Sequence, residues 1–233
     1  MRCPICYAPC MVALGYSKGF TYTMVGGMVW SVWALAHAPP SLGSAALLFA
    51  FTLLVTDLIS GLLHVVLDNP RSLKLGPIRS LAEGFQRHHE SPAKIYEMPL
   101  YQHLYVMHMP LTLLFLAILP FHNAGMYVVF LSLVVGLHLM QMAHLWAHLP
   151  AERVPAVVRV LQSARVLLRK PQHDLHHTPP FDKDFCIMTG ICNRPLNAVV
   201  SVIGPTTHFW LAIFVVVALA PMLVAFLVTG GVW

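Results

Sequence analysis

Charged residues are scarce in this sequence. Only 10% of its 233 residues are Asp, Glu, Lys or Arg, against about a quarter in a soluble domain, and 58% are hydrophobic. Several apolar stretches reach the roughly 20 residues that a helix needs to cross a bilayer. The composition excludes an ordinary soluble domain and predicts an integral membrane protein of the all-α class, a polytopic bundle of four or five transmembrane helices.

The N-terminus lacks the pattern of a cleavable signal peptide, because cysteines and prolines stand where a signal needs a basic start and an unbroken apolar core. We expect residues 1–19 to be a cytoplasmic segment and residues 20–233 to form a single membrane domain. The five cysteines are an odd number and predict no disulfide framework. Cys3 and Cys6 in CPIC form half of a possible metal site, with Cys10 nearby, but a tetrahedral thiolate site needs four ligands.

Five apolar segments are predicted to be membrane helices. They lie at about 20–37, 43–67, 104–121, 125–149 and 209–228. The long connections, 68–103 and 150–208, hold nearly all the polar residues. With five spans, all fourteen Lys and Arg residues fall on one side of the membrane. Since basic residues stay on the cytoplasmic side, we expect the N-terminus and both long loops to face the cytoplasm, whether the membrane is a bacterial inner membrane, the endoplasmic reticulum or a plastid membrane.

The net charge of +5 does not predict a nucleic-acid partner. A basic cytoplasmic surface beside anionic headgroups accounts for it. The segment 156–169, AVVRVLQSARVLLR, mixes apolar residues with three arginines. It could lie along the membrane interface, or it could be a short connecting helix in the cytoplasmic cap, and the sequence leaves both interpretations open.

Histidine is abundant, with fourteen copies. His144 and His148 have i, i+4 spacing and share one helix face. The stretch KPQHDLHHTPPF, residues 170–181, places three more at i, i+3 and i+4 of a predicted short helix. Imidazole suits iron, copper, nickel and zinc, and eight imidazoles in a cytoplasmic, histidine-rich cap are too many for one ion and suitable for two. The eight are His64, His88, His89, His144, His148, His173, His176 and His177.

Asp57 is the only charged residue inside any predicted span. It lies two helical turns before His64 on the same face, at a depth where a carboxylate is costly and marks a functional site by default. We expect it to accept a ring N–H from a ligating histidine and so to fix the tautomer of that histidine. Direct metal ligation is one alternative. A bond to a helix hydroxyl such as Thr56 or Ser60 is the other.

The remaining six histidines have weaker links to the predicted site. His103 and His108, at the cytoplasmic start of the third predicted helix, are possible members. His37 and His122 are expected at the far face of the membrane, His138 points off the ligand face, and His208 opens the last helix.

The pattern favours oxygen chemistry on a lipid over metal transport. Soluble di-iron proteins use Glu and Glu-x-x-His pairs on bundled helices, and such pairs are absent here. Metal ions held mainly by histidine at the water-facing ends of membrane helices could activate O₂, while the apolar bundle holds a lipid chain and excludes water. A metal or haem carrier is the alternative of another class, but a transporter places polar groups at the midplane in broken helices.

Four motifs resemble the membrane lipid desaturase family, which contains plasmanylethanolamine desaturase and the plant plastid enzyme that makes a trans-3 double bond in phosphatidylglycerol. They are DLISGLLH (57–64), FQRHHESP (85–92), HLWAH (144–148) and QHDLHHTPPFDKDFCIMTGICN (172–193), and the resemblance covers roughly 50–200. It implies two iron ions, O₂ as oxidant, a membrane phospholipid as substrate and an electron donor such as cytochrome b5 or a ferredoxin. It implies the eight histidines as ligands, Asp57 in support and Asn193, from a GxxN motif, as a water-bridged or supporting contact.

The implied reaction introduces a double bond near the glycerol end of a phospholipid chain, in the first instance converting a plasmanyl (alkyl ether) lipid to a plasmenyl (vinyl ether) lipid. Desaturation of an acyl chain of phosphatidylglycerol or another lipid is the main alternative, and a di-iron hydroxylase could use the same kind of site. After FQRHHESP the chain continues as AKIYEMPLYQHLYVMH, where ether-lipid members have a more polar stretch. The substrate therefore stays open at this stage.

Overall fold

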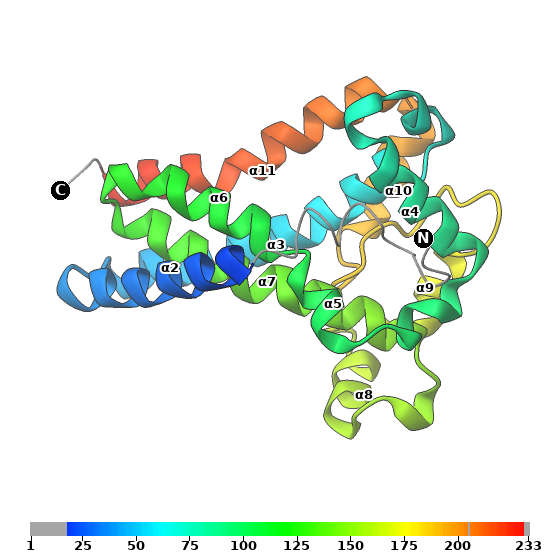
Figure 1. Cartoon of the computed structure of the whole chain (residues 1–233), viewed down its shortest axis with the longest axis horizontal. Helices are drawn as coiled ribbons and strands as arrows, with labels where there is room; N and C mark the ends of the chain where they lie inside the picture. The colour runs from blue at the N-terminus through cyan, green and yellow to red at the C-terminus, as the bar shows by residue number, and fades with distance from the viewer. Residues whose placement is uncertain (1–17, 205, 231–233) are drawn as a thin grey trace.

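Every regular element in the computed structural model is a helix, over the described residues 18–204 and 206–230 (Figure 1). Five helices pack together as a bundle at one end of the molecule, and shorter helices form a cap at the other end. The five are α2 (Lys18–His37), α3 (Leu42–Leu67), α6 (His108–Ile118), α7 (Ala124–His148) and α11 (Thr207–Thr229). The all-α prediction is confirmed, whereas Cys3, Cys6 and Cys10 lie outside the described residues.

Four segments of the described chain are long and apolar enough to cross a membrane, within the predicted range of four or five. They are Leu42–Leu67, Leu100–Phe121, Ala124–His148 and Thr207–Thr229. The other predicted span, 20–37, is less apolar and forms α2, whose 20 residues reach about 30 Å. α2 packs against α6 and α7 and exposes Val25, Val29 and Trp33. Its outer face is thus apolar, as the face of a membrane helix is.

Polar caps define the short connections between the bundle helices. The Ser41 hydroxyl accepts the Ser44 N–H at 3.1 Å and starts α3. The Asn123 side chain accepts the Met126 N–H at 3.0 Å and starts α7. Before it, His122 has a left-handed backbone (φ 45°) and ends the short 3₁₀ helix η4 (Leu119–Phe121). These local signals turn the chain sharply and place α6 and α7 side by side.

Both predicted long loops meet in the cap at the same end of the bundle (Figure 1). The first contains η1 (Pro70–Lys74), η2 (Gly76–Ile78), α4 (Arg79–Glu90), η3 (Pro92–Glu97) and α5 (Leu100–Tyr105). The second contains η5 (Ala151–Arg153), α8 (Ala156–Ser163), α9 (Lys170–His176) and α10 (Asn193–Ile203). The segment 156–169 thus begins with a short helix, α8, which projects sideways from the cap.

The chain that follows α9 returns against the cap end of α3. Gly61 permits this approach, because a Cβ there would lie 2.5 Å from the sulfur of Cys186 and 2.6 Å from a methyl group of Leu196. Phe185 and Cys186 are buried together with Leu62 and other apolar residues of α3. This packing ties the last histidine motif to the helix that carries His64.

Candidate metal centre

The eight predicted histidines converge where the bundle meets the cap. His64 comes from the last turn of α3, His88 and His89 from the end of α4, and His144 and His148 from the end of α7. His173 and His176 lie on α9, and His177 follows directly after it. The eight rings separate into two groups, and within each group the possible ligand atoms lie within 4.8 Å of one another.

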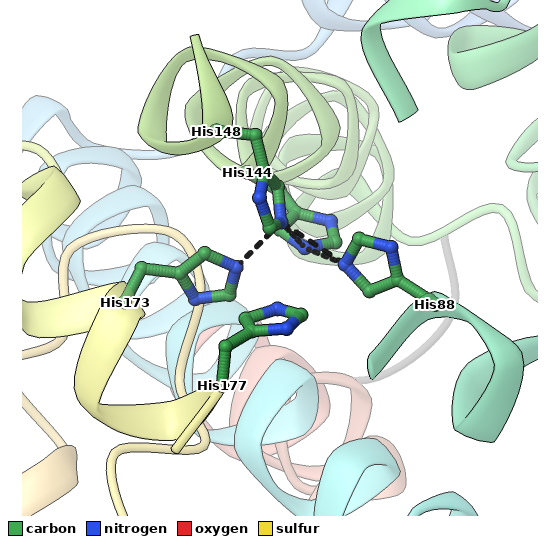
Figure 2. A group of neighbouring side chains, drawn as sticks. All are labelled: His88, His144, His148, His173 and His177. Atoms are coloured by element: carbon green, nitrogen blue, oxygen red, sulfur yellow. Dashed lines mark hydrogen bonds between the residues drawn. The ribbon is translucent and has the colours of Figure 1, made fainter. Parts of the chain in front are cut away.

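The first group contains five histidines and no other candidate ligand (Figure 2). The Nε2 atom of His148 lies 3.0 Å from that of His88, 3.1 Å from that of His144 and 2.8 Å from that of His173. The ring of His177 completes the group, with its centroid 4.7 Å from His88 and 4.8 Å from His148. Imidazoles from three elements, α4, α7 and the α9 segment, therefore point their nitrogen edges at one small volume.

The second group contains three histidines and one carboxylate, Asp68. One carboxylate oxygen, Oδ2, lies 3.0 Å from Nδ1 of His64 and 3.3 Å from Nε2 of His176. The other, Oδ1, lies 3.2 Å from Nε2 of His89. The Nδ1 atom of His64 and the Nε2 atom of His176 are 3.1 Å apart. Asp68 thus contacts every histidine of its group.

Hydrogen bonds between the rings cannot account for this crowding. A neutral imidazole has one N–H and one lone pair, so the Nε2 atoms of His88, His144, His148 and His173 cannot all be paired with one another. His64 Nε2, His89 Nδ1 and both nitrogens of His177 are buried without a hydrogen-bond partner among the described residues. Metal–nitrogen bonds of about 2.0–2.1 Å place two ligands of one ion roughly 3 Å apart. The residues of both groups therefore fit metal ions.

The protonation states of the cap residues also suit metal binding. Burial, followed by the charges of neighbouring histidines, holds the pKa of His88 and of His173 well below the usual value, so both rings are neutral. Burial alone would raise the pKa of Asp68, but His64 and the hydrogen bonds from His176, His64 and His89 outweigh it and keep this pKa well below its usual range. Neutral imidazoles and an ionised carboxylate are the forms that bind metals.

Asp57 occupies a different place from the one expected. Its Oδ1 accepts the backbone N–H of Thr189 at 2.7 Å and of Gly190 at 3.1 Å, and its Oδ2 accepts that of Cys192 at 3.1 Å. The carboxylate is fully buried, and its described hydrogen bonds go to this backbone segment and not to a histidine ring. Asp68 makes the histidine contacts that were expected of Asp57. Asp57 instead fastens the segment after α9 to α3.

Ser60 and Asn193 brace the same segment. The Ser60 hydroxyl accepts the Ile187 N–H at 3.0 Å and donates to the Asp57 backbone carbonyl at 2.6 Å. The Asn193 side chain accepts the Cys186 N–H at 2.6 Å and donates to the Cys186 carbonyl at 3.3 Å. The direct contacts of Asn193 are thus with backbone behind the histidine cluster.

His103 and His108 lie outside both groups of candidate ligands. His103 is buried near the start of the α5–α6 segment. The Nδ1 atom of His108 lies 2.9 Å from the Thr21 hydroxyl, and its ring faces His138 at 5.5 Å. The Nδ1 atom of His138 lies 2.7 Å from the Val134 carbonyl oxygen. Each of these rings has a local contact away from the two groups.

Asp68 is the candidate ligand that the sequence analysis missed. It lies four residues after His64, in HVVLD, so the i, i+4 spacing that singled out His144 and His148 also pointed to it. It falls one residue beyond the end of α3, Leu67, and outside the predicted span 43–67. Asp68 was therefore not counted among the charged residues of the predicted spans.

These observations define a class: a helical membrane protein with two adjacent histidine-rich candidate metal sites at one end of its bundle. The lipid desaturase domain family matches residues 53–219. This match covers most of the chain and includes all eight histidines and both aspartates, and the protein belongs to this family.

The relatives are of two kinds by name, plasmanylethanolamine desaturases and chloroplastic fatty acid desaturases. The chain is 26% identical over 207 residues to the plasmanylethanolamine desaturase of Myxococcus xanthus, covering 83% of this chain and 70% of that protein. It is 27% identical over 145 residues to the chloroplastic fatty acid desaturase 4 of Arabidopsis thaliana, covering 62% of this chain and 45% of the relative. A 56-residue segment, 24% of this chain and 20% of the relative, is 39% identical to plasmanylethanolamine desaturase 1 of Mus musculus.

The chain spans about half the length of two chloroplastic desaturases of Arabidopsis thaliana, 45% of fatty acid desaturase 4 and 58% of fatty acid desaturase 4-like 1. No solved structure matches the chain at a significant level.

Proposed function

We propose that this protein is a di-iron, O₂-dependent oxidoreductase that introduces a double bond near the glycerol end of a membrane phospholipid chain. The preferred reaction converts a plasmanyl (alkyl ether) lipid to a plasmenyl (vinyl ether) lipid. The observation that carries the proposal is the pair of adjacent, buried groups of imidazoles, one with a carboxylate, where membrane helices end in the cap. Eight histidines and Asp68 would hold two iron ions between them.

Iron held in this way would supply the activation of O₂ that removal of hydrogen from an unactivated methylene requires. The chain itself holds Asp68 ionised against three of the imidazoles. It also buries His64, His144, His148, His173 and His176. Removing two hydrogens from the lipid while O₂ becomes two water molecules takes up two further electrons and two protons. We propose that a donor such as cytochrome b5 or a ferredoxin provides these electrons.

The position of the cluster supports oxidation close to the glycerol backbone. The histidines lie where the bundle meets the cap, and not at the middle of the helices. The glycerol backbone of a phospholipid lies near the membrane surface, at this same level. We also propose that the cap faces the cytoplasm, since Lys and Arg residues gather in the two long loops that form it.

A second candidate reaction is desaturation of an acyl chain of phosphatidylglycerol. It is favoured by the plant relatives, which are 27% and 26% identical to this chain, against 26% for the bacterial ether-lipid enzyme. The ether-lipid reaction stays first because the match to the Myxococcus xanthus protein extends over more of this chain, 83% against 62% and 76%.

Lipid analysis of a host that lacks such enzymes tests the proposal. The chain and its His176→Ala variant are expressed with alkyl-ether and diacyl phospholipids supplied. We expect acid-labile vinyl ethers only with the unchanged chain. A double bond near the carboxyl end of an acyl chain would assign the second reaction instead. A hydroxylated lipid, with iron bound and reduced donor present, would contradict desaturation.

A further inference from the structure

A cavity of about 330 Å³ opens from the surface of the cap toward the five-histidine group. His148 and His177, both members of that group, line it. The rest of its wall comes from η3, from the turn after α7 and from α9, including Tyr96, Lys170 and Asp174. Its volume lies in the range of small-ligand sites, roughly 300–1,000 Å³. A molecule in this cavity would lie directly beside candidate metal ligands.

One charge of each sign lies on the α9 wall of the cavity. Lys170, Asp174 and His177 are spaced i, i+4 and i+7, which aligns them along one helix face. The Lys170 ammonium lies 2.9 Å from the Asp174 carboxylate, and the two side chains are 47% and 53% exposed. Ion pairs this exposed contribute little to stability, so the pair can exchange its internal contact for contacts with a ligand.

The lining of the cavity holds one cation and one carboxylate, Lys170 and Asp174. Tyr96, another lining residue, has the guanidinium of Arg153 over its ring at 5.4 Å from the centroid. The charges that a ligand in the cavity can contact are therefore those of Lys170 and Asp174.

The elements next to the cavity expose apolar side chains. α5 follows η3 and leaves Leu100 and Tyr101 each 51% exposed, and α8 follows η5 and leaves Val157 and Val160 exposed. α5, α8 and α9 lie on the same side of the cap in Figure 1. Exposed apolar residues among arginines are typical of segments at the membrane interface. The cavity is thus positioned to receive a molecule that enters from the lipid surface.

We propose that this cavity binds the polar headgroup of the phospholipid substrate, with Lys170 contacting the phosphate and Asp174 contacting the ammonium of an ethanolamine headgroup. The inference rests on the proposed function and names its substrate class. An ethanolamine headgroup carries one charge of each sign and donates N–H bonds to a carboxylate. A glycerol headgroup would leave Asp174 beside the phosphate with no cation to contact.

Headgroup binding can be measured without turnover. The purified protein is equilibrated with an equal mixture of phosphatidylethanolamine and phosphatidylglycerol of identical chains, and bound lipid is counted by native mass spectrometry. We expect the unchanged protein to retain the ethanolamine lipid preferentially. Asp174→Lys should shift the ratio toward the glycerol lipid by about threefold to fivefold, as a charge contact worth up to about 1 kcal/mol allows. Lys170→Glu should weaken both lipids together.

Glu83→Lys is the matched control. Glu83 forms an exposed i, i+4 pair with Arg79 at 2.9 Å, on α4 and away from the cavity. This substitution changes the net charge by the same amount as Asp174→Lys, and we expect it to leave the lipid ratio unchanged. If Asp174→Lys moved the ratio no more than Glu83→Lys, the headgroup assignment would be wrong.

Turnover in vesicles separates this inference from the proposed function. A shifted binding ratio in a protein that desaturates no lipid would support the headgroup site and contradict the proposed function. If Asp174→Lys desaturated lipids normally and kept the headgroup preference of the unchanged protein, the proposed function would be supported and the headgroup site contradicted. If Asp174→Lys slowed turnover with reduced ferredoxin but not with dithionite, and left the lipid ratio unchanged, the cavity would be a contact for the electron donor and the headgroup inference would be overturned.

Discussion

The two groups of candidate ligands differ in charge and in the way they are held together. The first consists of five imidazoles and no carboxylate, and helix spacing places two pairs of them: His144 and His148 on α7, His173 and His177 at i, i+4 along the α9 segment. The second has three imidazoles from three different elements, and Asp68 contacts all of them. Local spacing thus pairs four of the five ligands of the first group, whereas the second is joined by one carboxylate.

One histidine of the second group has a partner in the surrounding chain. His176 Nδ1 lies 2.9 Å from the Lys183 carbonyl, which fixes its ring. Both groups have ring nitrogens that are buried without a hydrogen-bond partner among the described residues, such as His173 Nδ1 in the first and His64 Nε2 in the second. The difference between the groups is therefore mainly one of charge. A dication gains more from a site with a net negative ligand set than from a neutral one. We therefore expect the Asp68 group to bind its ion more tightly.

Loss of one ligand from either group should have the largest effect. His144→Ala removes an imidazole from the first group and His176→Ala removes one from the second. Each is expected to abolish desaturation, because the two ions act together, while the protein still inserts in the membrane. Iron analysis and lipid analysis of both variants provide the measurement. Full activity in either variant would show that the ligand set is wrong.

Asp68→Asn should separate the two groups. The substitution keeps the size of the side chain but removes the charge that the second group shares. Affinity of that group for iron is expected to fall at least about 10–100-fold, as for partners that orient metal ligands. Titration with iron should then change from two equivalents per chain to one tight equivalent. Equal weakening of both equivalents would contradict the assignment of Asp68 to one group.

Asp57→Asn tests whether Asp57 holds the backbone of residues 189–192 against α3. Asn is neutral and retains one acceptor oxygen, so the backbone N–H groups of Thr189, Gly190 and Cys192 all lose a charged acceptor and at least one of them loses its acceptor altogether. Hydrogen bonds to charged groups contribute about 1.5–3 kcal/mol each, and we expect a loss of stability of about that size. Hydrogen exchange should rise at these three amides. Exchange that rises uniformly over the chain would argue against a local anchor.

His122→Ala should have the smallest effect. His122 is exposed, and it lies between α6 and α7 at the end of the bundle far from both groups. Activity and iron content should be unchanged. Because its φ is 45°, a conformation that any Cβ disfavours, His122→Gly should be about 1 kcal/mol more stable than His122→Ala. Loss of iron in His122→Ala would mean that the groups are coupled through the length of the bundle.

Helices and candidate ligands could be predicted well because their signals are local. The apolar stretch of α7 and the i, i+4 spacing of His144 and His148 lie within one helix, where 3.6 residues per turn decide which side chains share a face. The predicted boundaries 43–67 and 125–149 agree with α3 (Leu42–Leu67) and α7 (Ala124–His148) within one residue at each end. Similarity to a family supplied the expected chemistry of these histidines.

The roles of the aspartates could not be predicted, because they depend on which segment returns to α3. Seven residues of helix place Asp57 on the same face as His64 but about 10 Å deeper, and there its carboxylate accepts hydrogen bonds from the backbone of residues 189–192. Asp68, one residue past the helix, lies level with the rings.

Composition and spacing alone determined that this chain is a helical membrane protein with a histidine-rich end, because hydropathy and helical periodicity act over a few turns. Only the tertiary structure decided how eight imidazoles divide between two groups, which aspartate meets them, and where a cavity reaches them. These features join residues more than a hundred positions apart, such as His64 and His176. Their pairing is set by the packing of the returning chain around Gly61, and no local pattern encodes it.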